Sequence, residues 1–181
     1  YGWKNYPYDY YNIWVKNSGK EPYLEEATLE ILTGEYDLII FKHCFPVSRI
    51  QPDSGTPDID SEIRSLENYK LQYDALKEKM HQFPDNRFII WTPAVNTQKL
   101  MTEDEAIRTR EFRDWVINEW DVKGDNIFVW DFYSYETEVG LYLAEKNAVS
   151  SENSHPNVEF AEGVAPLFGQ FIIDVFESRV E

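Results

Sequence analysis

The segment SENSHPN, Ser151 to Asn157, places a histidine between a carboxylate and a proline. Glu152 precedes His155 by three residues, so a turn can bring the carboxylate to the imidazole. A carboxylate in that position orients the ring and stabilises the imidazolium that forms when the histidine takes a proton. Pro156 disfavours a helical backbone at His155, which indicates that the ring projects from a loop ahead of a helix. We predict that His155 is a general base oriented by Glu152; the alternative is a histidine that only caps a surface helix.

A second set of polar residues, Lys42, His43 and Cys44, directly follows an apolar run. Each can offer a hydrogen bond or positive charge to an oxyanion, which makes the three residues candidates for an oxyanion site or a pocket wall. Cys44 is also a candidate nucleophile, because a neighbouring imidazole such as His155 can activate a thiol. The alternative is that one of the three faces the core, as a small hydrophobic cysteine often does.

Metal and cofactor chemistry finds no support in the spacing of the ligand-type residues. No HxxxH, HxxE or HxD pattern links His43 and His81, and His81 fits the surface of a helix near its end. Cys44 is the only cysteine, which excludes a cysteine cage and an intrachain disulfide. We expect neither a metal nor a cofactor, and the cellular compartment stays open.

Three short apolar runs are typical of buried strands, namely Tyr36–Phe41, Arg87–Pro93 and Asn126–Phe132. The loops that follow them, FKHCFP, TPAVNT and DFYSYE, then meet at one edge of a parallel sheet. Ligands bind at that edge in open α/β sheets. The candidate residues Lys42, His43 and Cys44 belong to the first of these loops.

Helical patterns separate the three runs. Apolar residues recur at helical spacing from Ile59 to Met80, and a capping box formed by Thr102 and Glu105 precedes a second helix. A third helix follows His155. Strands that alternate with helices predict an α/β fold with three layers, α/β/α, around a parallel sheet.

We expect residues 1–181 to form a single domain, because the length and the 43% hydrophobic content suffice for one core. Three strands make a narrow sheet. Tyr11–Asn17 is the remaining strand candidate, and we expect the sheet to lack a strand that precedes Tyr1.

The net charge of −16, from 33 acidic and 17 basic residues, opposes binding to nucleic acid and to anionic lipid surfaces. No apolar run approaches the ~20 residues that cross a bilayer, so we expect no membrane insertion. The opening YGWKNYPYDYYNIW contains seven aromatic residues, which we expect to dock on the core; the alternative is that they stack on sugar rings.

The segment ENSHPN with its following helix resembles the late DxxHP block of the SGNH/GDSL hydrolases, with Glu152 at the aspartate position and His155 at the histidine. The runs YDLIIF and RFIIWTP are similar to central strands of that family. The resemblance covers roughly Tyr36 to the C-terminus and implies a flavodoxin-like fold. The GDS-like serine block is absent from these 181 residues, and KHCF, Lys42 to Phe45, occupies the place of the GxND block.

The resemblance implies an ester hydrolase that acts on a small-molecule or carbohydrate ester, with His155 as the base and a serine upstream of Tyr1 as the nucleophile. The alternative is an SGNH-like binding module for a glycan or a protein, without a nucleophile. A third hypothesis is a structural segment whose missing strands come from another chain. The sequence does not indicate the substrate or the oligomeric state.

Overall fold

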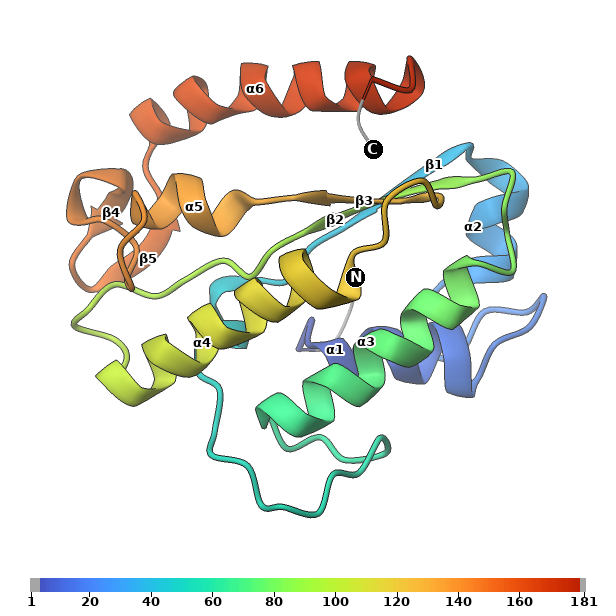
Figure 1. Cartoon of the computed structure of the whole chain (residues 1–181), viewed down its shortest axis with the longest axis horizontal. Helices are drawn as coiled ribbons and strands as arrows, with labels where there is room; N and C mark the ends of the chain where they lie inside the picture. Colours follow the sequence, from blue (N-terminus) through green and yellow to red (C-terminus); the bar gives the residue numbers. More distant parts are fainter. Residues whose placement is uncertain (1–3, 180–181) are drawn as a thin grey trace.

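A computed structural model of the chain describes residues 4–179 (Figure 1). Its centre is a parallel sheet with the strand order β1-β2-β3, made of β1 (Leu38–Phe41), β2 (Arg87–Trp91) and β3 (Ile127–Trp130). Phe41 lies opposite Ile90, and Ile90 lies opposite Val129. The three strands predicted from the apolar runs are therefore confirmed.

Helices cover both faces of this sheet, as Figure 1 shows. One face is covered by α6 (Val158–Phe176), and the other by α3 (Leu66–Met80) and α4 (Glu103–Trp115). Phe88, Ile89 and Ile90 of the central strand are fully buried, because side chains on both faces of β2 meet a helical layer. The three-layer α/β fold is confirmed.

The helix α4 begins with the predicted capping box. Thr102 N–H donates to Oε2 of Glu105 at 2.8 Å, and Glu105 N–H donates to Oγ1 of Thr102 at 3.3 Å. The helix continues into one turn of π-helix, η3 (Val116–Trp120). Gly124 then turns the chain with a φ of +83°, a conformation that residues with a Cβ rarely adopt.

The helix α3 is shorter than its apolar pattern predicts, because it begins after Ser65 and not near Ile59. The Ser65 hydroxyl accepts a hydrogen bond from Asn68 N–H at 3.4 Å and caps the first turn. Residues 51–65 form a loop instead. Its two ends are joined by a hydrogen bond that Gln51 N–H donates to the Arg64 carbonyl at 2.7 Å. Ile63 is 57% exposed there, so its helical spacing was coincidental.

The strand predicted at Tyr11–Asn17 is wrong. The chain forms α1 (Pro7–Tyr11), which continues as the π-helix η1 (Asn12–Lys16). Tyr10, Ile13 and Trp14 are buried at helical spacing and join the core on the α3 face of the sheet. The aromatic segment thus docks on the core as expected from residue 4 onward, whereas residues 1–3 lie outside the described part.

Shorter elements complete the chain: α2 (Leu29–Glu35), the 3₁₀-helix η2 (Phe45–Ser48), α5 (Phe132–Thr137), the 3₁₀-helix η4 (Glu145–Asn147), β4 (Ala148–Ser150) and β5 (Asn153–Pro156). The strands β4 and β5 pair antiparallel and lie beside α5, beyond the carboxyl end of the sheet (Figure 1). This small ribbon carries His155 to the sheet edge at which the sequence predicts a site.

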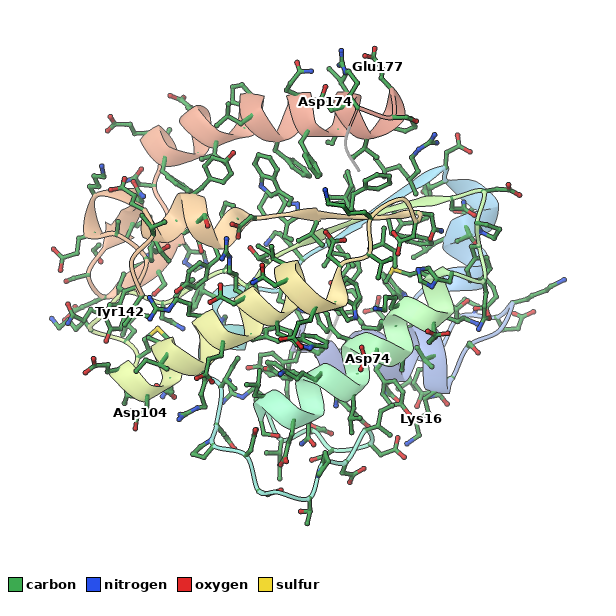
Figure 2. The ribbon with its side chains drawn as sticks, in the orientation of Figure 1. Lys16, Asp74, Asp104, Tyr142, Asp174 and Glu177 are labelled. Atoms are coloured by element: carbon green, nitrogen blue, oxygen red, sulfur yellow. The ribbon has the colours of Figure 1, made fainter. Side chains whose placement is uncertain are left out.

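Side chains fill the space between α6 and the sheet, while labelled acidic residues such as Asp104, Asp174 and Glu177 lie on the outside (Figure 2). This distribution is that of an acidic surface around a packed interior. Within residues 4–179, no helix is both long enough and apolar enough to cross a membrane.

Candidate functional site

A cavity of about 320 Å³ lies between the carboxyl ends of the strands and the first half of α6. Most of its wall is apolar and includes the rings of Phe45, Trp91 and Phe168. Besides the indole N–H of Trp91, five lining residues carry polar side-chain groups: Lys42, Cys44, Glu136, Ser154 and His155. The cavity therefore collects residues from the loops after β1 and β3 and from β5, at the edge where parallel α/β sheets bind ligands.

Lys42 and Cys44, just after β1, line this cavity. His43 between them points to the opposite face, where it contacts Tyr73 of α3, as the alternation of an extended chain requires. His43 is 1% exposed. Its Nδ1 donates to the Asn5 carbonyl at 3.1 Å, and its Nε2 accepts from the Tyr73 hydroxyl at 2.8 Å. Burial lowers the pKa of His43 to about 4, so the ring is neutral at physiological pH. Both ring nitrogens are used, and His43 is a core residue in this structure.

His155 lines the cavity with its ring edge against Phe45, at a centroid distance of 4.9 Å. Its Nδ1 lies 2.7 Å from Oδ1 of Asn153. An amide oxygen only accepts hydrogen bonds, so the proton resides on Nδ1 and the lone pair on Nε2. Within residues 4–179, Nε2 has no hydrogen-bond partner. His155 therefore has the tautomer that a general base needs.

The predicted partner of His155 points elsewhere. The ammonium of Lys99 donates a hydrogen bond to Oε1 of Glu152 at 2.5 Å and forms an ion pair with it. Both side chains are exposed. Asn153 takes the orienting position in its place. An amide fixes the tautomer as a carboxylate does, but it carries no charge to stabilise an imidazolium.

Ser154 is the serine that lines the cavity, yet its hydroxyl is occupied. It donates to Oδ1 of Asn96 at 3.1 Å and accepts from Thr97 N–H at 3.0 Å. The residue is 1% exposed. Ser154 therefore joins the β2 loop to β5 and is not a free nucleophile.

Glu136, on α5, is the site residue that the sequence analysis did not single out. It is 0% exposed, its Oε2 accepts from Val95 N–H at 2.8 Å, and its Oε1 has no partner among the described residues. Burial raises the pKa of Glu136 to about 8, against the opposing effects of the Val95 N–H and the charge of Lys42.

The sequence did contain a signal for Glu136. Phe132, Tyr133, Glu136 and Thr137 follow one another at helical spacing, and all four are buried. A carboxylate on a helix face that also carries two aromatic rings, in a segment already assigned to the site edge, is unusual enough to select.

An ion pair next to the cavity fixes the start of α5. Arg113 contacts Asp131, which also accepts hydrogen bonds from Thr92 at 3.1 Å and from Ser134 at 2.5 Å. Burial alone would raise the pKa of Asp131, but its bonds to Arg113 and Ser134 outweigh burial and lower the pKa. Asp131 is thus a charged anchor between α4 and the end of β3.

No group of three or more His, Cys, Asp or Glu residues is arranged to hold a metal ion in the described part of the chain. Comparison of the chain with protein families, with curated proteins and with solved structures finds no match in any of the three.

Proposed function

We propose that the chain is an SGNH-like ester hydrolase in which His155 acts as the general base at the cavity. One observation carries the proposal: His155 lines an apolar cavity at the carboxyl ends of parallel strands, with its proton on Nδ1 and a free lone pair on Nε2. A base with that tautomer at such an edge is the acid–base half of a hydrolase site.

The reaction is an acyl transfer. A hydroxyl or thiol attacks the ester carbonyl carbon while Nε2 of His155 takes its proton, and the carbonyl oxygen becomes an oxyanion. The Lys42 ammonium is the cationic group at the cavity available to that oxyanion. The bond to the leaving alcohol then breaks, and the imidazolium returns the proton to the alcohol. In the second half of the reaction, water attacks the acyl group on the nucleophile while His155 takes a proton from the water. The bond to the nucleophile breaks, His155 returns the proton to the nucleophile, and the acid is released.

The nucleophile has two candidates. The resemblance to SGNH/GDSL hydrolases implies a serine in a GDS-like block, which these 181 residues do not contain. Cys44 is the thiol at the cavity. Labelling of the protein purified from its source separates the two, because a fluorophosphonate modifies an activated serine and iodoacetamide modifies an activated Cys44.

The decisive test is turnover of p-nitrophenyl esters by His155→Gln. Loss of general-base catalysis lowers kcat/KM by roughly 10²- to 10⁴-fold. His81→Gln is the matched control, because His81 does not line the cavity. Its Nε2 lies 2.8 Å from Oδ2 of Asp125. Turnover that survives His155→Gln contradicts the proposal.

A second candidate is a binding module with the same cavity and no catalysis. The position of Glu152 favours it, since that carboxylate pairs with Lys99 and gives His155 no charged partner. This candidate predicts saturable ligand binding that His155→Gln leaves intact, and no labelling of a serine by fluorophosphonate.

A further inference from the structure

Glu136 places a carboxyl group at the cavity and leaves one of its oxygens without a partner. The residue lines the cavity and is 0% exposed, yet Oε1 has no hydrogen bond within residues 4–179. Buried polar atoms nearly always have a partner, because burial without one costs stability. No side chain of the described residues supplies the partner that Oε1 lacks.

The other oxygen decides where the proton of this carboxyl group lies. Oε2 accepts the Val95 N–H at 2.8 Å, so a proton on the group belongs on Oε1. Burial raises the pKa of Glu136 to about 8, and the group is mostly neutral at pH 7. Oε1 is then an O–H donor without an acceptor.

The polar surroundings offer no acceptor. Lys42, Cys44 and His155 are the other titratable residues on the cavity wall, and in the described part of the chain none is bonded to Glu136. Trp91 also lines the cavity; its Nε1 lacks a partner among the described residues, as do those of Trp120 and Trp130 in the core, so this nitrogen by itself indicates no ligand. The unpartnered Oε1 of Glu136, on a residue that lines the cavity, calls for a ligand that supplies an acceptor oxygen.

The remaining wall defines the rest of that ligand. Trp91 packs on Phe132 and Phe168 at centroid distances of 4.6 and 4.7 Å, and these rings form part of the cavity wall. A sugar ring would bury several hydroxyls against these rings without partners, whereas an alkyl chain loses no hydrogen bond there.

We infer that the cavity binds an uncharged acyl compound with an apolar chain, and that Glu136, as a neutral carboxylic acid, donates a hydrogen bond from Oε1 to its carbonyl oxygen. The substrate class rests on the proposed function, because the carbonyl would be that of the ester. The binding itself does not require hydrolysis, so a simple ketone, which an ester hydrolase does not cleave, tests the ligand site separately.

The experiment is calorimetric titration of the whole protein with 2-octanone at pH 6.5 and pH 9.5. Three proteins are compared: wild type, Glu136→Gln and Glu136→Leu. Glutamine is the matched variant, because its oxygen can accept the Val95 N–H while its NH₂ donates to the ligand at every pH. Lys42, Cys44 and His155 are present in all three proteins, so Glu136 is the titratable group of the cavity wall that differs between them.

At pH 6.5 we expect wild type and Glu136→Gln to bind 2-octanone alike and Glu136→Leu to bind it roughly 3- to 10-fold more weakly, the loss of one hydrogen bond. At pH 9.5 we expect the affinity of wild type for 2-octanone to fall by a similar factor and that of Glu136→Gln to stay unchanged. Equal behaviour of wild type and Glu136→Gln at pH 9.5 overturns the inference, and so does an absence of ketone binding to wild type.

Octylamine, which is cationic at both pH values, completes the test. Stronger binding of octylamine than of 2-octanone, increasing with pH in wild type but not in Glu136→Gln, would make Glu136 a site for cations and overturn the inference. Ketone binding as expected without any ester turnover would leave the ligand site standing and remove the proposed hydrolysis.

Discussion

The amide oxygen of Asn153 lies 2.7 Å from Nδ1 of His155, at the position for which the sequence predicts the carboxylate of Glu152. Both residues are on β5, so the ribbon that carries the imidazole also carries the group that orients it. This geometry keeps the lone pair on Nε2 but supplies no negative charge to a protonated ring.

Asn153→Ala is therefore expected to lower ester turnover by roughly tenfold, because the ring loses the bond that fixes its tautomer and direction. Glu152→Gln is expected to leave turnover within about twofold, since it changes only an exposed ion pair with Lys99. Steady-state kcat/KM for one p-nitrophenyl ester measures both. A large loss of kcat/KM in Glu152→Gln, with normal turnover in Asn153→Ala, would mean that Glu152 and not Asn153 orients the imidazole.

The stability of the protein should depend on pH through Glu136. Its pKa is raised from 4.5 to about 8, so the folded state holds a proton that the unfolded state has lost between these values. Stability is therefore full below pH 4.5, falls as the pH rises to about 8, and is level above it.

Glu136→Gln removes this dependence, because the amide cannot ionise. We expect the variant to equal wild type near pH 4.5 and to exceed it at pH 8.5, by on the order of 5 kcal/mol. Urea unfolding at both pH values measures the difference. Glu111→Gln, an exposed position on α4, is the control and should give the same small change at both. A difference that shrinks as the pH rises would contradict a raised pKa.

The α/β fold was predictable because its elements carry local signals. The runs at β1, β2 and β3 are apolar on both faces, and Thr102 with Glu105 specifies the start of α4 within four residues. The segment at α1 and η1 was misread because a short aromatic run fits both periods. Only contacts with distant residues, such as those of Trp14 in the core, select the helix.

The candidate site was predictable in part. The carboxyl edge of the sheet and the residues Lys42, Cys44 and His155 follow from chain order and strand alternation, which are local properties. The partners of Glu152 and the burial of Glu136 are not local. They depend on where Lys99 and Val95 lie after folding, more than 40 residues away in the chain.

The capping box of α4 gives a prediction about stability alone. Thr102→Ala removes the hydroxyl that accepts Glu105 N–H, at a cost of about 1 kcal/mol in the free energy of unfolding. Thr102→Ser keeps the hydroxyl and should stay within a few tenths of wild type. Urea unfolding of the three proteins measures the effect, and an equal loss in both variants would assign it to the methyl group instead.

The pair formed by His43 and Tyr73 is expected to hold the N-terminal segment on the core. Tyr73→Phe removes the hydroxyl that donates to Nε2 of His43 and leaves a buried nitrogen without a partner, which costs about 1–3 kcal/mol at pH 7.5. Tyr36→Phe, at an exposed ring, is the control and should cost little.

The pKa of His43 is lowered to about 4, so the stability contributed by the neutral ring is complete above pH 6.5 and is lost as the pH falls toward 4. His43→Gln should remove that acid-dependent loss, and unfolding measured from pH 7.5 to pH 4 would show it; a slope unchanged in His43→Gln would mean that His43 is not the group that titrates.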